Sequence, residues 1–367
     1  MILMNDFKAE DTALREAMLS AVQRVLDSGW YILGKELENF EHKWAKACGT
    51  SHGIGVGNGL DAIEISLRVL NIGSGDEVIT TPMTAFATVL AILRAGATPV
   101  LADIERDTAL LCPESVERCL SPKTKALVLV HLYGQVRSMS TWSQFCTDNN
   151  IALIEDCAQS HLAQWQGKVA GTFGQIGAYS FYPTKNLGAI GDGGMIVTSD
   201  AILAEKATRL RNYGQSKRYY HPELGMNSRL DEIQAAILSE RLKWLPEFTQ
   251  RRQDIGSIYQ TKLINPHVQL LANPEENQAH VYHLFVLQCE HREALQQHLQ
   301  KFGVQSLMHY PVPIHQQESC LDIKRDLQGL INSEYHAQTC LSIPCHPQMS
   351  DDDVNKVIET VNSFSLN

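Results

Sequence analysis

Short apolar runs alternate with stretches of helical periodicity between residues 77 and 156, and this alternation limits the possible folds more than any other feature. Each run is apolar along its length, which is typical of strands in a parallel sheet that helices cover on both faces. The pattern therefore predicts an α/β fold. We expect strands at Glu77–Thr81, Thr98–Asp103, Lys125–Gly134 and Ile151–Asp156, and helices at Thr84–Arg94 and Thr141–Asn149.

Polar residues stand where these predicted strands end, and function gathers at the carboxyl ends of parallel strands. Asp156 closes an otherwise apolar run, and because an isolated buried charge is costly, its carboxylate must be paired or hydrogen-bonded. It either caps the next turn or holds a cationic ring nitrogen, as an acidic residue does for pyridoxal phosphate. The other polar residues at these ends are Asp103, His131, Tyr133, Gln159 and His161.

Lys185 lies in the stretch Tyr179–Met195, between an apolar run and a glycine-rich loop. A lysine that loses hydration at the end of a buried strand has a lowered pKa, which makes its amine a candidate nucleophile. Glycines without a Cβ let the backbone approach a ligand closely. A surface lysine beside a flexible loop is the other interpretation of this stretch when it is taken alone.

A second glycine-rich turn precedes a helix within Gly53–Leu70. The free N–H groups and the positive dipole end of such a helix suit a phosphate, although a glycine-capped core helix has the same pattern. Ser180 offers a hydroxyl to the same phosphate. Lys185, Asp156 and the turn at Gly59 are together the three parts that a pyridoxal phosphate site requires.

The domain boundary is predicted at Pro246, where a long helix over Arg229–Leu245 ends. Residues 1–246 would form a large pyridoxal phosphate-binding domain with N-terminal helices at Asp11–Ser28 and Glu36–Ala47. Residues 247–367 would form a smaller C-terminal α+β domain. Its predicted elements are helices at Glu247–Leu263, Arg292–Phe302 and Asp351–Phe364 and a strand at Val281–Cys289.

Charge and cysteine usage narrow the possible partners and setting. A formal net charge of −10 argues against a nucleic-acid-binding protein. Nine cysteines without regular spacing suggest reduced thiols in a cytoplasmic protein, and we expect no membrane association because no apolar run is long enough to cross a bilayer. Histidines 280 and 283 would lie on opposite faces of a strand, so we expect no metal site there.

Seven longer motifs and a pair of arginines resemble those of the DegT/StrS-type sugar aminotransferases, a branch of the fold type I pyridoxal phosphate enzymes. The fold implied is a large domain with a mostly parallel, seven-stranded-type sheet and a smaller C-terminal α+β domain. GVGNGLDA and HLYGQ most resemble members that act on 3-keto nucleotide sugars. The motifs are GNGLDA (57–62), KALVLVHLYGQ (125–135), IEDCAQSH (154–161), SFYPTKNLGAIGDGG (180–194), LRNYG (210–214), GMNSRLDEIQAAIL (225–238), RR (251–252) and HYPVPIH (309–315).

The resemblance implies roles for residues around the cofactor. Lys185 would form the internal aldimine and shuttle a proton, and Asp156 would keep the pyridine nitrogen protonated. Gln159 would lie near the ring and its 3-oxygen. The phosphate would be bound by the Gly59 and Leu60 backbone, by the Ser180 hydroxyl and by Asn227 of the neighbouring subunit in a homodimer with shared active sites.

One position departs from the family pattern. Members usually place an aromatic residue directly after the threonine that corresponds to Thr84, where it stacks on the cofactor. Here Ala85 occupies that position and Phe86 follows it. We expect a shift of the turn to bring Phe86 over the ring, and loss of the stacking is the other outcome.

The remaining implied contacts are to substrates. Arg229 would bind a carboxylate, and His309 and Tyr310 would contact the nucleotide sugar. Lys217 and Tyr219 would meet the pyrophosphate, while Tyr182 would form a wall of the sugar site.

The function implied is transfer of an amino group from L-glutamate to a keto group, at C3, of a nucleotide-linked deoxysugar in deoxysugar or surface polysaccharide biosynthesis. A C4-keto sugar is one alternative substrate. Relatives that deoxygenate the sugar carry histidine in place of the lysine, and Lys185 argues against that reaction. A non-catalytic regulatory or sugar-binding protein is a further alternative, although it would be expected to have lost Lys185 or Asp156.

Overall fold

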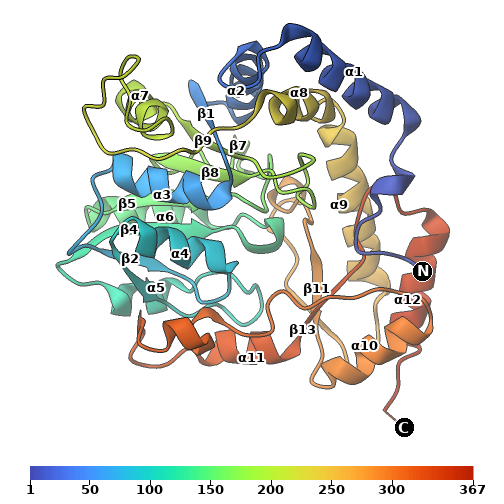
Figure 1. Cartoon of the computed structure of the whole chain (residues 1–367). Helices are drawn as coiled ribbons and strands as arrows, with labels where there is room; N and C mark the ends of the chain where they lie inside the picture. Colours follow the sequence, from blue (N-terminus) through green and yellow to red (C-terminus); the bar gives the residue numbers. More distant parts are fainter. Residues whose placement is uncertain (367) are drawn as a thin grey trace.

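The computed structural model describes residues 1–366, and its centre is an eight-stranded sheet (Figure 1). The strand order is β1-β9-β8-β5-β4-β2-β3-β12, with β1 and β9 antiparallel to their neighbours and the remaining pairs parallel. The predicted α/β class with a mostly parallel sheet is confirmed. The strands are β1 His52–Val56, β2 Glu77–Thr80, β3 Thr98–Leu101, β4 Thr124–Val130, β5 Ala152–Asp156, β8 Ile176–Ser180, β9 Gly194–Thr198 and β12 Lys324–Arg325.

Helices cover both faces of this sheet, as continuous apolar strands require. Successive residues of β4 alternate between two cores: Leu127 and Leu129 join the core under α2 and α6, whereas Ala126 and Val128 join the core under α3 and α4. Burial on both faces explains why the strand carries no polar side. The helices of the first 241 residues are α1 Thr12–Ser28, α2 Lys35–Cys48, α3 Gly59–Val69, α4 Phe86–Arg94, α5 Pro113–Cys119, α6 Met139–Asp148, α7 Ala201–Leu210 and α8 Glu232–Arg241.

The chain after α8 builds a second lobe around a three-stranded antiparallel sheet, at the lower right of Figure 1. We propose a domain boundary near Pro246, which lies in the first turn of α9. Ile314, Cys320 and Leu330 of the second part nevertheless pack against Val89 and Leu101 of the first, beside β12. The elements are α9 Leu245–Lys262, α10 Arg292–Lys301, α11 Ile331–Thr339, α12 Asp351–Asn362, β10 Gln269–Leu270, β11 Phe285–Gln288 and β13 Cys340–Ile343; a small hairpin, β6 Gln164–Trp165 and β7 Lys168–Val169, lies in the first part.

Several predicted elements are shorter in the structure. The strand expected to run to Gly134 ends at Val130, because the next residues turn and Tyr133 adopts the left-handed φ of 62°. The strand expected from Val281 begins only at Phe285. The helix expected over Arg229–Leu245 is α8 alone, which begins at residue 232 and ends at 241. Among the described residues, no helix is long and apolar enough to cross a membrane.

Glu232 ties α8 to the N-terminus of α2 and generates a stability prediction. Its buried carboxylate accepts hydrogen bonds from the amides of Gly34 at 2.8 Å, Glu36 at 2.9 Å and Leu37 at 3.1 Å. Glu232→Gln places an N–H group against these donors, so we expect the free energy of unfolding to fall by about 1–3 kcal/mol. Urea unfolding would measure the loss. The exposed Glu38→Gln is the control, and equal stability of the two variants would contradict this role.

Candidate active site

The register of β5 places the candidate site at the carboxyl edge of the sheet. Asp156 pairs with Val130 of β4 on one side and with Ala178 of β8 on the other. Residues that follow these three strands therefore converge at one edge, as is usual for ligand sites in parallel sheets.

Asp156 is buried at this edge, and its carboxylate is held by two donors. Oδ2 accepts a hydrogen bond from Thr88 Oγ1 at 2.8 Å, and Oδ1 accepts one from the Ala158 amide at 3.1 Å. Thr84 Oγ1 lies 2.8 Å from Thr88 Oγ1 and donates to it, because the Thr88 proton is already directed to the carboxylate. Thr88 is not among the residues predicted from the sequence. Its position one turn after Thr84 at the start of a helix is the only signal that could have suggested it.

Lys185 follows β8 by one turn, with its amide donating to the Tyr182 carbonyl at 2.8 Å. The side chain keeps partial contact with solvent. Desolvation nevertheless lowers the pKa of its amine to about 8, against the opposing attraction of the Asp156 carboxylate. An amine with this pKa is neutral in about a tenth of the molecules at pH 7, far more than for an ordinary lysine, and the neutral form is what a nucleophile or general base requires.

Three histidines surround this lysine and are held neutral. Burial, and secondarily the charge of Lys185, lowers the pKa of His161 to about 3, that of His309 to about 4 and that of His283 well below its usual value. His161 Nδ1 accepts the Leu187 amide at 3.0 Å, so its ring supports the loop after Lys185.

His283 and its neighbour His280 do not lie in a strand, which corrects the sequence prediction of two opposite faces. His283 Nδ1 lies 3.2 Å from Asn186 Oδ1, directly beside Lys185 in the chain. His280 instead stacks on Tyr282 with ring centroids 3.9 Å apart. The segment turns here because the backbone of Tyr282 has a positive φ of 41°.

The N-terminus of α3, where the phosphate site is predicted, lies against the end of β8. A Cβ on Gly59 would stand 2.6 Å from the Ser180 Cβ, so only glycine allows this approach. Asn58 caps the helix by accepting the Asp61 amide at 2.8 Å. Within the described residues, the amides of Gly59 and Leu60 donate to no protein group, because the first turn of a helix has no internal acceptors.

These residues fit pyridoxal phosphate by the chemistry of their donors. A desolvated amine, a buried carboxylate, and two free amides beside a hydroxyl match an aldehyde, a ring nitrogen and a phosphate respectively. The close approach of Gly59 to Ser180 is the observation that tests the fit, because it places the free amides of α3 beside the Ser180 hydroxyl.

Gln159 connects the site to the segment that carries His309 and Tyr310. Its Oε1 accepts the Tyr133 amide at 2.6 Å, and its Nε2 donates to the Tyr310 hydroxyl at 3.3 Å. Burial raises the pKa of Tyr310 to about 12, with a smaller contribution from Asp156. The structure therefore brings these residues together at the edge where Asp156 lies.

Phe86 is the first residue of α4, two positions before Thr88, and Ala85 precedes the helix in extended conformation. The ring is 39% exposed and is not part of the core. Its stacking on a cofactor stays a prediction.

The other residues that are predicted to contact substrates lie on more exposed segments. Ser228 Oγ accepts the Gly57 amide at 2.9 Å, which places the strand-like segment of Asn227 and Arg229 beside the start of α3. Arg229 donates to Asn212 at 3.2 Å. Tyr182 is 53% exposed.

Lys217 and Tyr219 belong to an exposed loop. In the part of the chain that the structure describes, their cation–π contacts stay within that loop, to Tyr220 at 4.2 Å and to Arg218 at 5.1 Å. The structure therefore does not join these two residues to the inner site.

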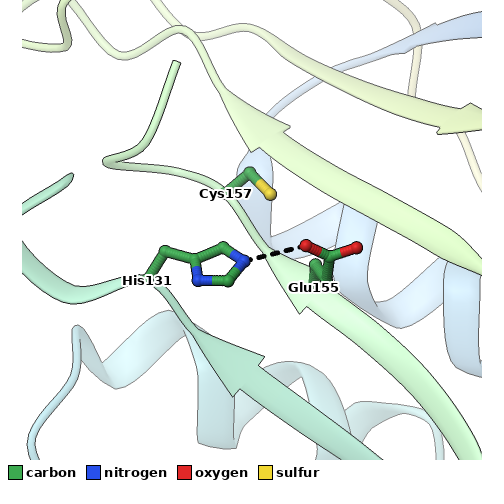
Figure 2. A group of neighbouring side chains, drawn as sticks. All are labelled: His131, Glu155 and Cys157. Atoms are coloured by element: carbon green, nitrogen blue, oxygen red, sulfur yellow. Dashed lines mark hydrogen bonds and ion pairs between the residues drawn. The ribbon is translucent and has the colours of Figure 1, made fainter. Parts of the chain in front are cut away.

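His131, Glu155 and Cys157 form a separate buried cluster whose ligand atoms lie within 4.8 Å of one another (Figure 2). This donor set resembles a metal site. Glu155, however, already accepts the His131 Nε2–H group at 2.9 Å and three backbone amides, of Gly171 at 2.7 Å, Phe173 at 2.7 Å and Gly174 at 2.9 Å. Four donors occupy the carboxylate, so we interpret the cluster as a node that holds the 171–174 turn against β5.

Comparison with known proteins agrees with this geometry. The family model of the DegT/DnrJ/EryC1/StrS aminotransferase family matches residues 12–362. The chain belongs to this family. A relative in Aneurinibacillus thermoaerophilus, a dTDP-3-amino-3,6-dideoxy-alpha-D-galactopyranose transaminase, is 43% identical over 364 residues, which are 99% of each chain.

Solved aminotransferase structures superpose on nearly the whole chain. S. venezuelae DesV in complex with a ketimine intermediate matches with a TM-score of 0.95 and 40% identity, over 98% of this chain and 97% of the other. NtdA from Bacillus subtilis, with bound cofactor PMP, matches with a TM-score of 0.88 and 29% identity, over 96% and 82% of the two chains. The aminotransferase fold and the transaminase class predicted from the sequence are confirmed.

The desolvation of Lys185 generates a prediction about stability. Lys185→Met removes the cost of burying the charged amine, so the cofactor-free protein should gain roughly 1–3 kcal/mol at pH 7. Native Lys185 loses its proton near pH 8 and the unfolded chain near 10.5, so the gain should shrink as pH rises between these values. Urea unfolding at pH 7, 8, 9 and 10 would measure it.

The control for this series is Lys125→Met, at an exposed lysine in β4. Its effect on the free energy of unfolding should not change over the same pH range. A gain for Lys185→Met that is equal at pH 7 and pH 10 would show that the amine is not desolvated.

Proposed function

We propose that this aminotransferase uses pyridoxal 5′-phosphate to transfer an amino group from L-glutamate to the C3 keto group of a nucleotide-linked deoxysugar. The observation that carries the proposal is the desolvated amine of Lys185, near enough to the buried carboxylate of Asp156 for that charge to raise its pKa, together with the free amides of α3. The A. thermoaerophilus relative, named for a 3-amino sugar product, supports C3. Deoxysugar or surface polysaccharide biosynthesis is the proposed setting.

Each inner residue has a chemical task in this reaction. Pyridoxal phosphate, when bound, supplies an electron sink for charge that develops on the carbon bearing the amino group. The Lys185 amine would take a proton from that carbon and deliver it to C4′ of the cofactor. Its pKa of about 8 suits both accepting and donating this proton. Asp156 holds the proton on the ring nitrogen, while Thr88 fixes the carboxylate at 2.8 Å.

The outer residues are proposed to recognise the two substrates. His309 and Tyr310 contact the nucleotide sugar and Tyr182 forms a wall of its site. Arg229 binds the glutamate carboxylate. Lys217 and Tyr219 meet the pyrophosphate, a role that requires their exposed loop to move toward the site. All nine cysteines are free thiols, as is usual in the cytoplasm, where we propose that the enzyme works.

The decisive experiment supplies the purified enzyme with L-glutamate and a panel of 3-keto and 4-keto sugars linked to thymidine or uridine diphosphate. We expect a 3-amino sugar as the product, identified by mass spectrometry and NMR. Lys185→Ala should lower turnover by about 10³-fold or more, because the transferred proton loses its carrier. Lys125→Ala is the matched control and should keep full activity.

Other outcomes of this experiment would favour a C4-keto sugar transaminase or a non-catalytic protein. A 4-amino product would assign the enzyme to C4 sugars. Tight sugar binding without any amination would favour a regulatory protein.

We further propose a homodimer in which Asn227 binds the phosphate of the cofactor in the partner subunit. Asn227 is exposed, and large apolar side chains are exposed on α1 and the turn after it, with Leu19 at 71% and Trp30 at 62%. Exposed apolar side chains of this size suit an interface between subunits.

Asn227→Ala should leave the dimer intact and weaken cofactor affinity about tenfold, because one hydrogen bond to a charged group is lost. Light scattering would give the mass, and an absorbance titration with pyridoxal phosphate would give the affinity. Asn355→Ala, at an exposed asparagine of α12, is the control. A stable monomer with full cofactor affinity would rule out the role across the interface.

A further inference from the structure

A series of buried hydrogen bonds joins the two lobes and ends at the backbone of His309. Gln288 Nε2, at the end of β11, donates to His336 Nδ1 of α11 at 2.8 Å. His336 Nε2 lies 2.8 Å from the Tyr133 hydroxyl, which in turn donates to the His309 carbonyl. Because the hydroxyl proton is directed to that carbonyl, the His336 Nε2–H group must be the donor to Tyr133. The three hydrogen bonds then run in one direction, from Gln288 through His336 and Tyr133 to the His309 carbonyl. We call this series the Tyr133 relay.

Every side chain in this relay is shielded from water. Gln288 and Tyr133 are 2% exposed and His336 is fully buried. Burial lowers the pKa of His336 to about 4, which keeps the ring neutral and its donor and acceptor fixed near neutral pH. The hydrogen bond from His336 thus restricts the Tyr133 hydroxyl to one orientation.

The backbone of Tyr133 is held in an unusual conformation. Its φ of 62° is rare for a bulky residue, and such geometry persists only where the surroundings enforce it. This conformation lets the amide and the hydroxyl of Tyr133 each make a hydrogen bond to a different segment. The Tyr133 amide donates to Gln159 Oε1 at 2.6 Å, while its side chain reaches the His309 carbonyl.

Two of the contacts that fix the segment after residue 308 lead to Tyr133, and a third joins His309 Nδ1 to Ser342 Oγ at 2.8 Å. His309 is held through its carbonyl, and Tyr310 is held through Gln159 Nε2 at 3.3 Å. The Tyr310 ring also packs on the core formed between the lobes, which includes Tyr133 and Cys340. Loss of the Tyr133 hydroxyl would release the His309 carbonyl and leave the contacts of the His309 ring and of Tyr310 in place.

We propose that Tyr133 is a positioning residue for the keto sugar: its hydroxyl, oriented by His336, holds the His309–Tyr310 segment where it meets the sugar. This inference rests on the proposed function, in which these two residues contact the nucleotide sugar. Tyr133 acts through them and touches neither substrate. Its backbone supports Gln159 separately, so the glutamate half of the reaction does not depend on the hydroxyl.

Tyr133→Phe tests the proposal in the holoenzyme by removing only the hydroxyl. The two half-reactions are followed separately by the cofactor absorbance, first with L-glutamate and then, in the aminated enzyme, with the 3-keto sugar nucleotide that the wild type converts. We expect the rate constant with glutamate to change by less than about twofold. The specificity constant for the keto sugar should fall about 10- to 100-fold, because a buried carbonyl and a buried N–H group lose their partner.

The matched control is Tyr259→Phe. Tyr259 is also fully buried, and its hydroxyl donates to a backbone carbonyl, that of Pro344, at 2.9 Å in the C-terminal lobe. It should lose comparable stability in urea unfolding and keep both half-reactions. A fall in the sugar half-reaction that is equal in the two variants would overturn the proposal, as would an equal fall of both half-reactions in Tyr133→Phe.

A variant of the second residue separates orientation from packing. His336→Gln retains an N–H donor for the Tyr133 hydroxyl and should keep most of the sugar specificity constant, whereas His336→Leu should match Tyr133→Phe. The double variant of Tyr133→Phe with His336→Leu should be no worse than either single change, and full additivity would contradict a shared relay. Wild-type enzyme that reacts with glutamate but with no keto sugar would refute the proposed substrate, and this inference with it.

Discussion

The parallel register of β4, β5 and β8 is the constraint on which the site depends. Because Asp156 pairs with Val130 and with Ala178, the residues that follow all three strands emerge at one edge. A shift of one residue would turn Asp156 toward the opposite face of the sheet. The two apolar cores oppose such a shift, since each buries alternate residues of the same strands. Packing in these two cores thus fixes which edge of the sheet carries Asp156 and the rest of the candidate site.

Burial at this edge makes the Lys185 amine easier to deprotonate than that of an ordinary lysine. Desolvation lowers the pKa of Lys185 to about 8, and Asp156 offsets only part of that effect. The neighbouring histidines stay neutral for the same reason, and the pKa of His161 falls to about 3. Neutral rings can accept hydrogen bonds from the lysine loop without adding positive charge beside it. One physical cause, burial, therefore lowers the pKa of Lys185 and keeps the ring of His161 neutral, so that it can accept the Leu187 amide.

Particular residues show how far sequence reasoning reaches. Asp156 and Lys185 could be predicted as site residues because each is a charged group at the end of an apolar run, a pattern that the sequence alone shows. Thr88 could not be found in this way, since a threonine in the first turn of a helix has no unusual feature. The strand predicted to Gly134 was too long because apolar composition does not reveal the left-handed turn at Tyr133.

The sequence by itself determined the α/β class, the family and the residue types of the site, because strand alternation and motif composition are local properties of the chain. The tertiary structure alone decided which of these residues work together. The bond from Thr88 to Asp156 spans 68 positions and that from Tyr133 to His336 spans 203. The pKa of Lys185 likewise depends on how much water the assembled lobes exclude. Contacts at such separations follow from packing, and no local pattern encodes them.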